Sequence, residues 1–65
     1  MNLQLLKRLD EEGLKTFDSK VNFDKWMNTS WEFLNDRKPK DCLENEKGIK
    51  RITNILIQIR HGIFA

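Results

Sequence analysis

Few side chains in this 65-residue chain could carry out a reaction, because it has one histidine, His61, and one cysteine, Cys42. A catalytic centre needs an acid and a base or an activated nucleophile, and a metal site needs several ligands. There is no glycine-rich phosphate loop, and the adjacent acids Asp10, Glu11 and Glu12 are typical of a solvated face. The sequence therefore predicts a protein that is not an enzyme and uses no cofactor or metal. Cys42 is expected to be a buried small hydrophobic residue.

Residues suited to binding lie in the last third of the chain, which is predicted to form one long amphipathic helix. Asn45 can accept a hydrogen bond from a first-turn amide, and Glu46 suits the positive end of the helix. Arg60 and His61 suit the negative end, and Gly62 is placed to end the helix. A core stripe about 80° wide is expected from the spacing of Ile49, Ile52, Leu56, Ile59 and Ile63.

The apolar surface of this helix is wider than a small domain needs. Ile55 and Ile57 flank the core stripe on opposite sides, so the apolar arc widens to roughly 200°. We therefore expect one edge to contact another chain, and the candidate edge consists of Thr53, Ile57, Arg60 and Phe64. The alternative is that Ile57 is a singly exposed apolar residue, which is common. The solvated face is expected to consist of Lys47, Lys50, Arg51, Asn54, Gln58 and His61.

The first third of the chain predicts a second amphipathic helix, from Leu3 to Phe17. Its core-facing stripe, about 140° wide, comprises Leu3, Leu6, Leu9, Leu14 and Phe17. Gly13 lies inside this stretch and costs about 1 kcal/mol relative to alanine in a helix. It indicates either that the helix is interrupted or that another element approaches closely at this point.

Shorter elements are predicted between the two long helices. A turn over residues 18–20 with helix-capping side chains precedes a short helix whose core face is Phe23, Trp26 and Met27. Thr29 and Glu32 have the spacing of a capping box that opens a further helical turn. Asn35 and Asp36 tolerate positive φ in a polar turn, and Pro39 suits the first position of a short helix from Pro39 to Glu44. Gly48 is expected to allow close approach of another helix.

Together these patterns predict an all-α fold and a single domain over residues 1–65. In this small helical domain, two longer amphipathic helices flank two short helices. With 34% charged and 38% hydrophobic residues the composition is that of a globular protein. A chain this short is marginally stable alone, so a homo-oligomer or a heteromeric complex is expected. No apolar run is long enough to span a membrane and no secretory signal is present, so the expected location is the cytoplasm.

Nucleic acid is an alternative partner, because six cations could form one basic surface on which Trp31 stacks bases. These cations are Arg37, Lys38, Lys40, Lys47, Lys50 and Arg51. The net charge is only +2, and the acids Asp36, Asp41, Glu44 and Glu46 are interleaved with the cations. A mixed, solvated face is therefore favoured over a nucleic-acid site.

From Trp26 onward, over about two thirds of the chain, the sequence resembles the C-terminal toxin-binding domain of the Xre/MbcA/ParS antitoxin family. The family pattern runs Trp-Leu, Pro-Asn, Leu-Gly-Gly-Arg-x-Pro-Leu-Asp-Leu-Leu, a glycine, and a helix that ends in Gly-Val. Without a gap, the matching positions are Trp26-Met27, Leu34, Arg37, Pro39, Asp41, Leu43, Gly48, Ile52, Leu56, Arg60 and Gly62-Ile63.

The sequence also departs from the family pattern. Ser30-Trp31 replaces Pro-Asn, Asn35-Asp36 replaces Gly-Gly, and Lys40 replaces a leucine. Asparagine and aspartate accept the positive φ that a glycine pair would supply. A DNA-binding helix-turn-helix region often precedes this domain in the family, and this chain is expected to contain the toxin-binding domain alone.

The resemblance implies an antitoxin that neutralises an intracellular toxin enzyme of the RES type, which degrades NAD. In such pairs the C-terminal segment of the antitoxin covers the active site of the toxin. By position, that segment would be Arg60, His61, Gly62, Ile63, Phe64 and Ala65, with Lys50 and Arg51 on the neighbouring face. A guanidinium, an aromatic ring and a carboxylate could together fill a cleft that binds a dinucleotide pyrophosphate.

Two other readings of Arg60 and Phe64 are open. Arg60 could compensate the charge of the helix end, and Phe64 could fold back onto the core. The domain could also be a stand-alone inhibitor or assembly module for another partner, such as a phage or defence-system protein. The same apolar edge would then serve that partner.

Overall fold

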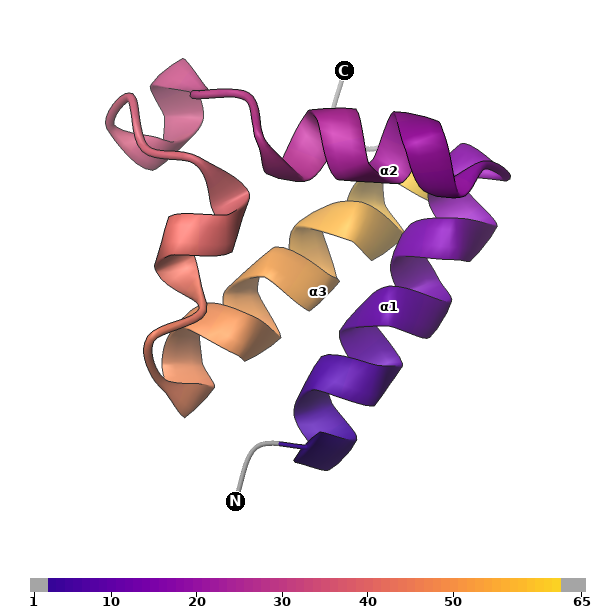
Figure 1. Ribbon diagram of the computed structural model, residues 1–65, viewed down its shortest axis with the longest axis horizontal. Helices are drawn as coiled ribbons and strands as arrows, with labels where there is room; N and C mark the ends of the chain where they lie inside the picture. Colours follow the sequence, from indigo (N-terminus) through magenta and orange to yellow (C-terminus); the bar gives the residue numbers. More distant parts are fainter. Residues whose placement is uncertain (1–2, 63–65) are drawn as a thin grey trace.

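The computed structural model describes residues 3–62 and contains three α-helices and two short 3-10 helices. The helices are α1 (Leu3–Phe17), α2 (Lys20–Met27), η1 (Glu32–Leu34), η2 (Pro39–Cys42) and α3 (Glu46–Arg60) (Figure 1). Helices α1 and α3 pack together, α2 lies across their carboxyl-terminal ends, and the segment with η1 and η2 returns the chain to the start of α3. No strand occurs between residues 3 and 62, so the predicted all-α class is confirmed.

Helix α1 has the predicted bounds, but its core-facing stripe is narrower than predicted. Leu9 is buried, and Leu5, Leu6 and Phe17 pack against the core. Leu3 and Leu14 are 71% and 43% exposed, so the prediction that they face the core was wrong. Leu3 lies in the first turn of α1, and in Figure 1 α1 and α3 lie farther apart at their first turns than at their carboxyl-terminal ends.

Gly13 does not interrupt α1, because the helix is continuous from Leu3 to Phe17. A Cβ atom at this position would overlap with the aromatic ring of Phe23 in α2. Gly13 therefore marks a close contact between α1 and α2, which is one of the two alternatives that the sequence allowed.

Helix α2 begins as predicted. Ser19 is its N-cap and accepts a hydrogen bond from the amide of Asn22 at 3.3 Å. Phe23, Trp26 and Met27 are all buried in the core, which confirms the face predicted for this helix. They follow the three- and four-residue spacing of neighbours on a helix surface.

The predicted capping box of Thr29 and Glu32 was wrong. The Thr29 hydroxyl donates to the carbonyl of Lys25 at 2.6 Å, in the last turn of α2, and the N-cap of η1 is Trp31, with no side-chain cap. The Lys25 carbonyl also accepts from the amide of Asn28 at 3.2 Å, so the Thr29 hydroxyl adds a second hydrogen bond to a carbonyl in the last turn of α2. The Thr29 side chain therefore closes α2 instead of opening η1.

Helix α3 supplies the centre of the core. Ile49, Ile52 and Leu56 are at most 1% exposed, and Ile59 packs against the core as a partly buried residue. Asn45 is the N-cap and accepts from the amide of Gly48 at 2.8 Å, and the last helical residue is Arg60. The predicted stripe and both predicted ends are thus confirmed, while Ile63 lies outside the described residues.

Candidate partner-binding surface

The face of α3 opposite the core is polar, as predicted. Its residues Lys47, Lys50, Arg51, Asn54, Gln58 and His61 are all exposed. They follow helical spacing and form one continuous strip along α3. By the rise of an α-helix, the strip from Lys47 to His61 is about 21 Å long.

The predicted contact edge of Thr53, Ile57, Arg60 and Phe64 is not one continuous surface. Thr53 is only 6% exposed, and its hydroxyl donates to the carbonyl of Ile49 at 2.8 Å. Ile55, which widened the apolar arc on the other side, is also buried at 6%, and Ile57 is half-buried. The domain itself therefore covers much of the wide apolar arc. Phe64 lies outside the described residues.

Arg60 contacts the first helix. Its Nη1 atom lies 2.7 Å from Oε1 of Glu12 in α1, and the two side chains are 29% and 13% exposed. This contact with Arg60 holds the pKa of the Glu12 carboxyl below its ordinary value of 4.5, against partial burial, which raises it. The charges of Lys15 and Arg8 lower it further. No local pattern in the sequence predicts this pair, because the two residues are 48 positions apart.

The Glu12–Arg60 pair makes stability depend on pH. Because the pKa of Glu12 is lower in the folded chain, its stabilising contribution is complete above the ordinary value and is lost as pH falls through the folded value. We expect the free energy of unfolding of the unmodified protein to fall more steeply than that of Glu12→Gln between about pH 5 and about pH 3. Denaturant titrations at each pH measure this, with the exposed neighbour Glu11→Gln as control.

A flat difference between Glu12→Gln and the unmodified protein across this range would show that the ion pair does not couple folding to proton binding. Glu11→Gln should follow the unmodified protein, since Glu11 is exposed and makes no ion pair within residues 3–62.

Beyond Arg60 the helix closes at the predicted residues. The amide of His61 donates to the carbonyl of Ile57 at 3.1 Å, and His61 is the C-cap. Gly62 follows with φ +74°, the left-handed conformation that glycine adopts freely. Both residues are exposed. The predicted site residues Ile63, Phe64 and Ala65 lie outside the described residues.

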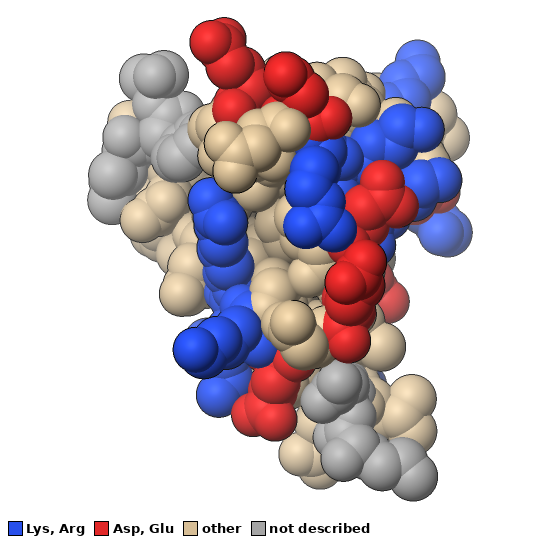
Figure 2. Space-filling view, turned by 90° about the vertical axis from the view of Figure 1, so that its left-hand side faces the viewer, with Lys and Arg blue, Asp and Glu red and all other residues tan. Residues whose placement is uncertain are grey.

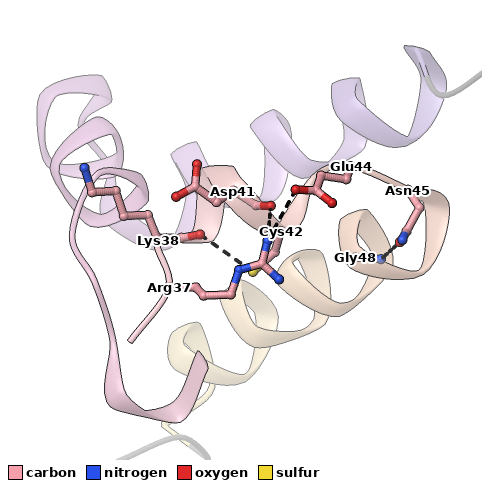
Figure 3. A network of polar contacts seen from close by, with 7 residues as sticks. All are labelled: Arg37, Lys38, Asp41, Cys42, Glu44, Asn45 and Gly48. Carbon is pink, nitrogen blue, oxygen red and sulfur yellow. Dashed lines mark hydrogen bonds and ion pairs between the residues drawn. The ribbon is translucent and has the colours of Figure 1, made fainter. Parts of the chain in front are cut away.

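A network of polar contacts fixes the segment that leads into α3 (Figure 3). The Arg37 guanidinium donates to the carbonyl of Asp41 at 2.7 Å and pairs with Glu44 at 3.5 Å. Cys42 is half-buried, less than predicted, and its thiol donates to the carbonyl of Lys38 at 3.6 Å. Arg37 therefore stabilises the segment between η2 and α3. The sequence pattern did not predict this role and suggested Arg37 as a possible nucleic-acid contact.

Backbone geometry agrees with two further predictions for the segment between η1 and the first turn of α3. Asn35 and Asp36 have φ of 58° and 62°, as predicted for the turn between η1 and η2. A Cβ atom on Gly48 would overlap with the carbonyl oxygen of Cys42, at the end of η2. The predicted close approach at Gly48 is therefore confirmed, and it involves the backbone of η2.

A groove of about 510 Å³ runs along the exposed face of α3 and is called the basic groove below. Phe33 of η1 and Ile55 supply its apolar part, and Asn54 and Gln58 supply amides. Its cations are Lys47, Lys50 and Arg51. Lys50 and Asn54 also line a smaller hollow of about 180 Å³ together with Leu5 and Arg8 of α1.

The charge on the neighbouring face is mixed. Figure 2 shows positive and negative side chains side by side on the face that carries η1, η2 and the start of α3. Lys50 pairs with Glu46 at 3.4 Å, and Arg37 pairs with Glu44. A duplex needs a broader surface of one sign, so this face is a poor match for a nucleic-acid backbone.

Other classes of site find no support in residues 3–62. No group of three or more histidine, cysteine, aspartate or glutamate residues is placed to hold a metal there. None of the helices described for the chain has the length and apolar character needed to cross a bilayer.

Comparison with known families agrees with the fold and with the residues that carried the resemblance. The family model described as the antitoxin Xre/MbcA/ParS C-terminal toxin-binding domain matches residues 12–62. The match begins in α1, well before Trp26, and ends at Gly62. No curated protein and no solved structure matches the chain. Because the family model covers most of its length, the chain belongs to the Xre/MbcA/ParS antitoxin family as a non-enzymatic C-terminal toxin-binding domain.

Proposed function

We propose that this domain neutralises a RES-type, NAD-degrading toxin in the cytoplasm by covering its active site with residues 60–65. The observation that carries the proposal is the family match, which extends along α3 to Gly62. The partner-binding residues proposed are Lys50, Arg51, Ile57, Arg60, His61, Gly62, Ile63, Phe64 and Ala65. Thr53, also predicted from the sequence, is withdrawn because its side chain is buried.

The structure supports this proposal through the way α3 is held. Its first turn is fixed by Asn45 and by the close approach of Gly48 to Cys42. Its last turn is fixed to α1 by Arg60 and Glu12. A segment that follows a rigid helix loses less conformational freedom on binding than one that follows a mobile linker.

The Glu12–Arg60 pair adds a condition to the proposal. For Arg60 to bind a phosphate-binding site of the toxin, its guanidinium must leave Glu12. The intramolecular carboxylate then competes with the toxin for the same cation. Glu12→Gln removes this competitor, so it should strengthen toxin binding while it weakens the α1–α3 contact.

The test uses the full chain with a tag at Met1, which leaves Ala65 free, to capture its partner from the native host. A captured enzyme that degrades NAD, and is inhibited by the chain, would support the proposal. An enzyme of another class, or no partner, would contradict the RES assignment. We also propose that the domain acts as a homo-oligomer or within a heteromeric complex, and the stoichiometry of the purified complex tests this.

The role of the C-terminal segment is tested with Arg60→Gln combined with Phe64→Ala. A guanidinium and an aromatic ring at the centre of an interface are each worth about 2 kcal/mol, so we expect the double variant to bind about 700-fold more weakly if the two losses add. Leu3→Ala, at an exposed position in the first turn of α1, is the matched control. Unchanged affinity of the folded double variant would place the contact on another surface.

A further inference from the structure

The proposed C-terminal segment is too small to be the whole interface. A standard protein–protein interface contains about 20–30 residues on each side, and residues 60–65 are only a fraction of that. A toxin that binds this segment must therefore contact a neighbouring part of the domain as well. The exposed strip of α3 is continuous with the segment, because Asn54, Gln58 and His61 succeed one another at helical spacing.

Resting on the proposed function, we infer that the basic groove binds an acidic segment of the toxin that carries an apolar side chain. The contact for the apolar side chain comes from Phe33, which is half-buried, and from the small exposed part of Ile55. Lys47, Lys50 and Arg51 provide the charge. The side-chain amides of Asn54 and Gln58 can donate hydrogen bonds to the backbone carbonyls of a bound segment and accept hydrogen bonds from its backbone amides.

The charges of the groove are available to a partner. Lys47 makes no ion pair within residues 3–62, and Lys50 makes one exposed pair with Glu46, with side chains 60% and 62% exposed. Arg51 is exposed and donates to the carbonyl of Phe33 at 3.5 Å, so it lies across the groove. Exposed pairs of this kind are weak and exchange easily for a partner's carboxylates.

An acidic protein segment fits this groove better than a nucleic-acid backbone. Glu46 pairs with Lys50, which lines the groove, and the neighbouring face carries both signs of charge (Figure 2). A polyphosphate backbone would meet these acids along its length, whereas a short acidic segment can be placed between them. The apolar surface of Phe33 and Ile55 is covered only if the bound segment has an apolar side chain as well as carboxylates.

The test measures affinity for the toxin captured with the unmodified chain, held in a catalytically inactive form. The groove variant is Lys47→Glu with Lys50→Glu, and the control is Lys7→Glu with Lys25→Glu, an equal charge change at exposed positions outside the groove. Glutamate at position 47 lies in the first turn of α3, where the helix dipole favours it, so the groove variant should fold. Thermal melts of both variants check this.

We expect the groove variant to bind about tenfold more weakly than the control at low salt, with a difference that narrows as salt is added. Equal affinities of the two variants would overturn the groove while leaving the toxin-binding function in place. Failure of the unmodified chain to capture any toxin would instead overturn the proposed function. Binding of a duplex DNA probe by the unmodified chain but not by the groove variant, at physiological salt, would also overturn the acidic partner.

Discussion

Gly48→Ala is expected to destabilise the domain by about 3 kcal/mol, which is a large part of the stability of a small domain. The added Cβ would overlap with the Cys42 carbonyl oxygen and lie 2.9 Å from the carbonyl carbon. Both atoms belong to the backbone, so no rotation of a flexible side chain can relieve the overlap. Alanine is more favourable than glycine within a helix by only about 1 kcal/mol, so this gain offsets only part of the loss.

The strain would be concentrated where η2 meets α3. The turn of η2 is held by Arg37 and by the Cys42 thiol, so it can move only by breaking those contacts. Denaturant unfolding followed by tryptophan fluorescence gives the free energy. The neighbouring variant Lys47→Ala, at an exposed position, should lie within about 0.5 kcal/mol of the unmodified protein. Stability of Gly48→Ala equal to that of Lys47→Ala would show that η2 and α3 can separate freely.

Leu56→Ala is the second change with a large expected effect, a loss of about 2–5 kcal/mol. Leu56 is 0% exposed and lies in the second half of α3, among core residues from all three α-helices. Truncation removes buried apolar surface and leaves a cavity whose lining loses its contacts. For a domain of this size, such a loss should leave much of the chain unfolded near body temperature.

Leu3→Ala is the matched control for Leu56→Ala, because it removes the same atoms from a helical leucine. Leu3 is 71% exposed, so we expect a change within about 0.5 kcal/mol. Calorimetry or circular dichroism melts measure both. Equal losses in the two variants would mean that the buried role of Leu56 is not what stabilises the domain.

The parts of the fold that depend on local signals could be predicted from the sequence. Asn45 and Gly62 mark the ends of α3 through hydrogen bonds and backbone geometry within a few residues. The positive φ values of Asn35 and Asp36 follow from side chains that tolerate the left-handed region.

Features that depend on distant elements could not be predicted. The helical pattern places Leu14 in the apolar stripe of α1, but only the positions of α2 and α3 decide how much of it is covered. The Thr29 hydroxyl could bond forward to the amide of Glu32 or backward to a carbonyl of α2, and it bonds backward to the carbonyl of Lys25. The same limit applies to the candidate site. Arg60 meets Glu12 across 48 residues, and Phe33 joins the groove on α3 because of how the intervening turn folds.

Helix α3 carries the central core on one side and the exposed polar strip on the other, and this links partner binding to folding thermodynamically. A partner that binds only folded α3 shifts the folding equilibrium of the entire domain, because unfolding α3 dismantles the core. At a concentration about 100 times its Kd, such a partner adds about 2.7 kcal/mol, which lowers the unfolded population about a hundredfold. Where proteases cut unfolded chains, the lifetime of the domain would follow the supply of its partner.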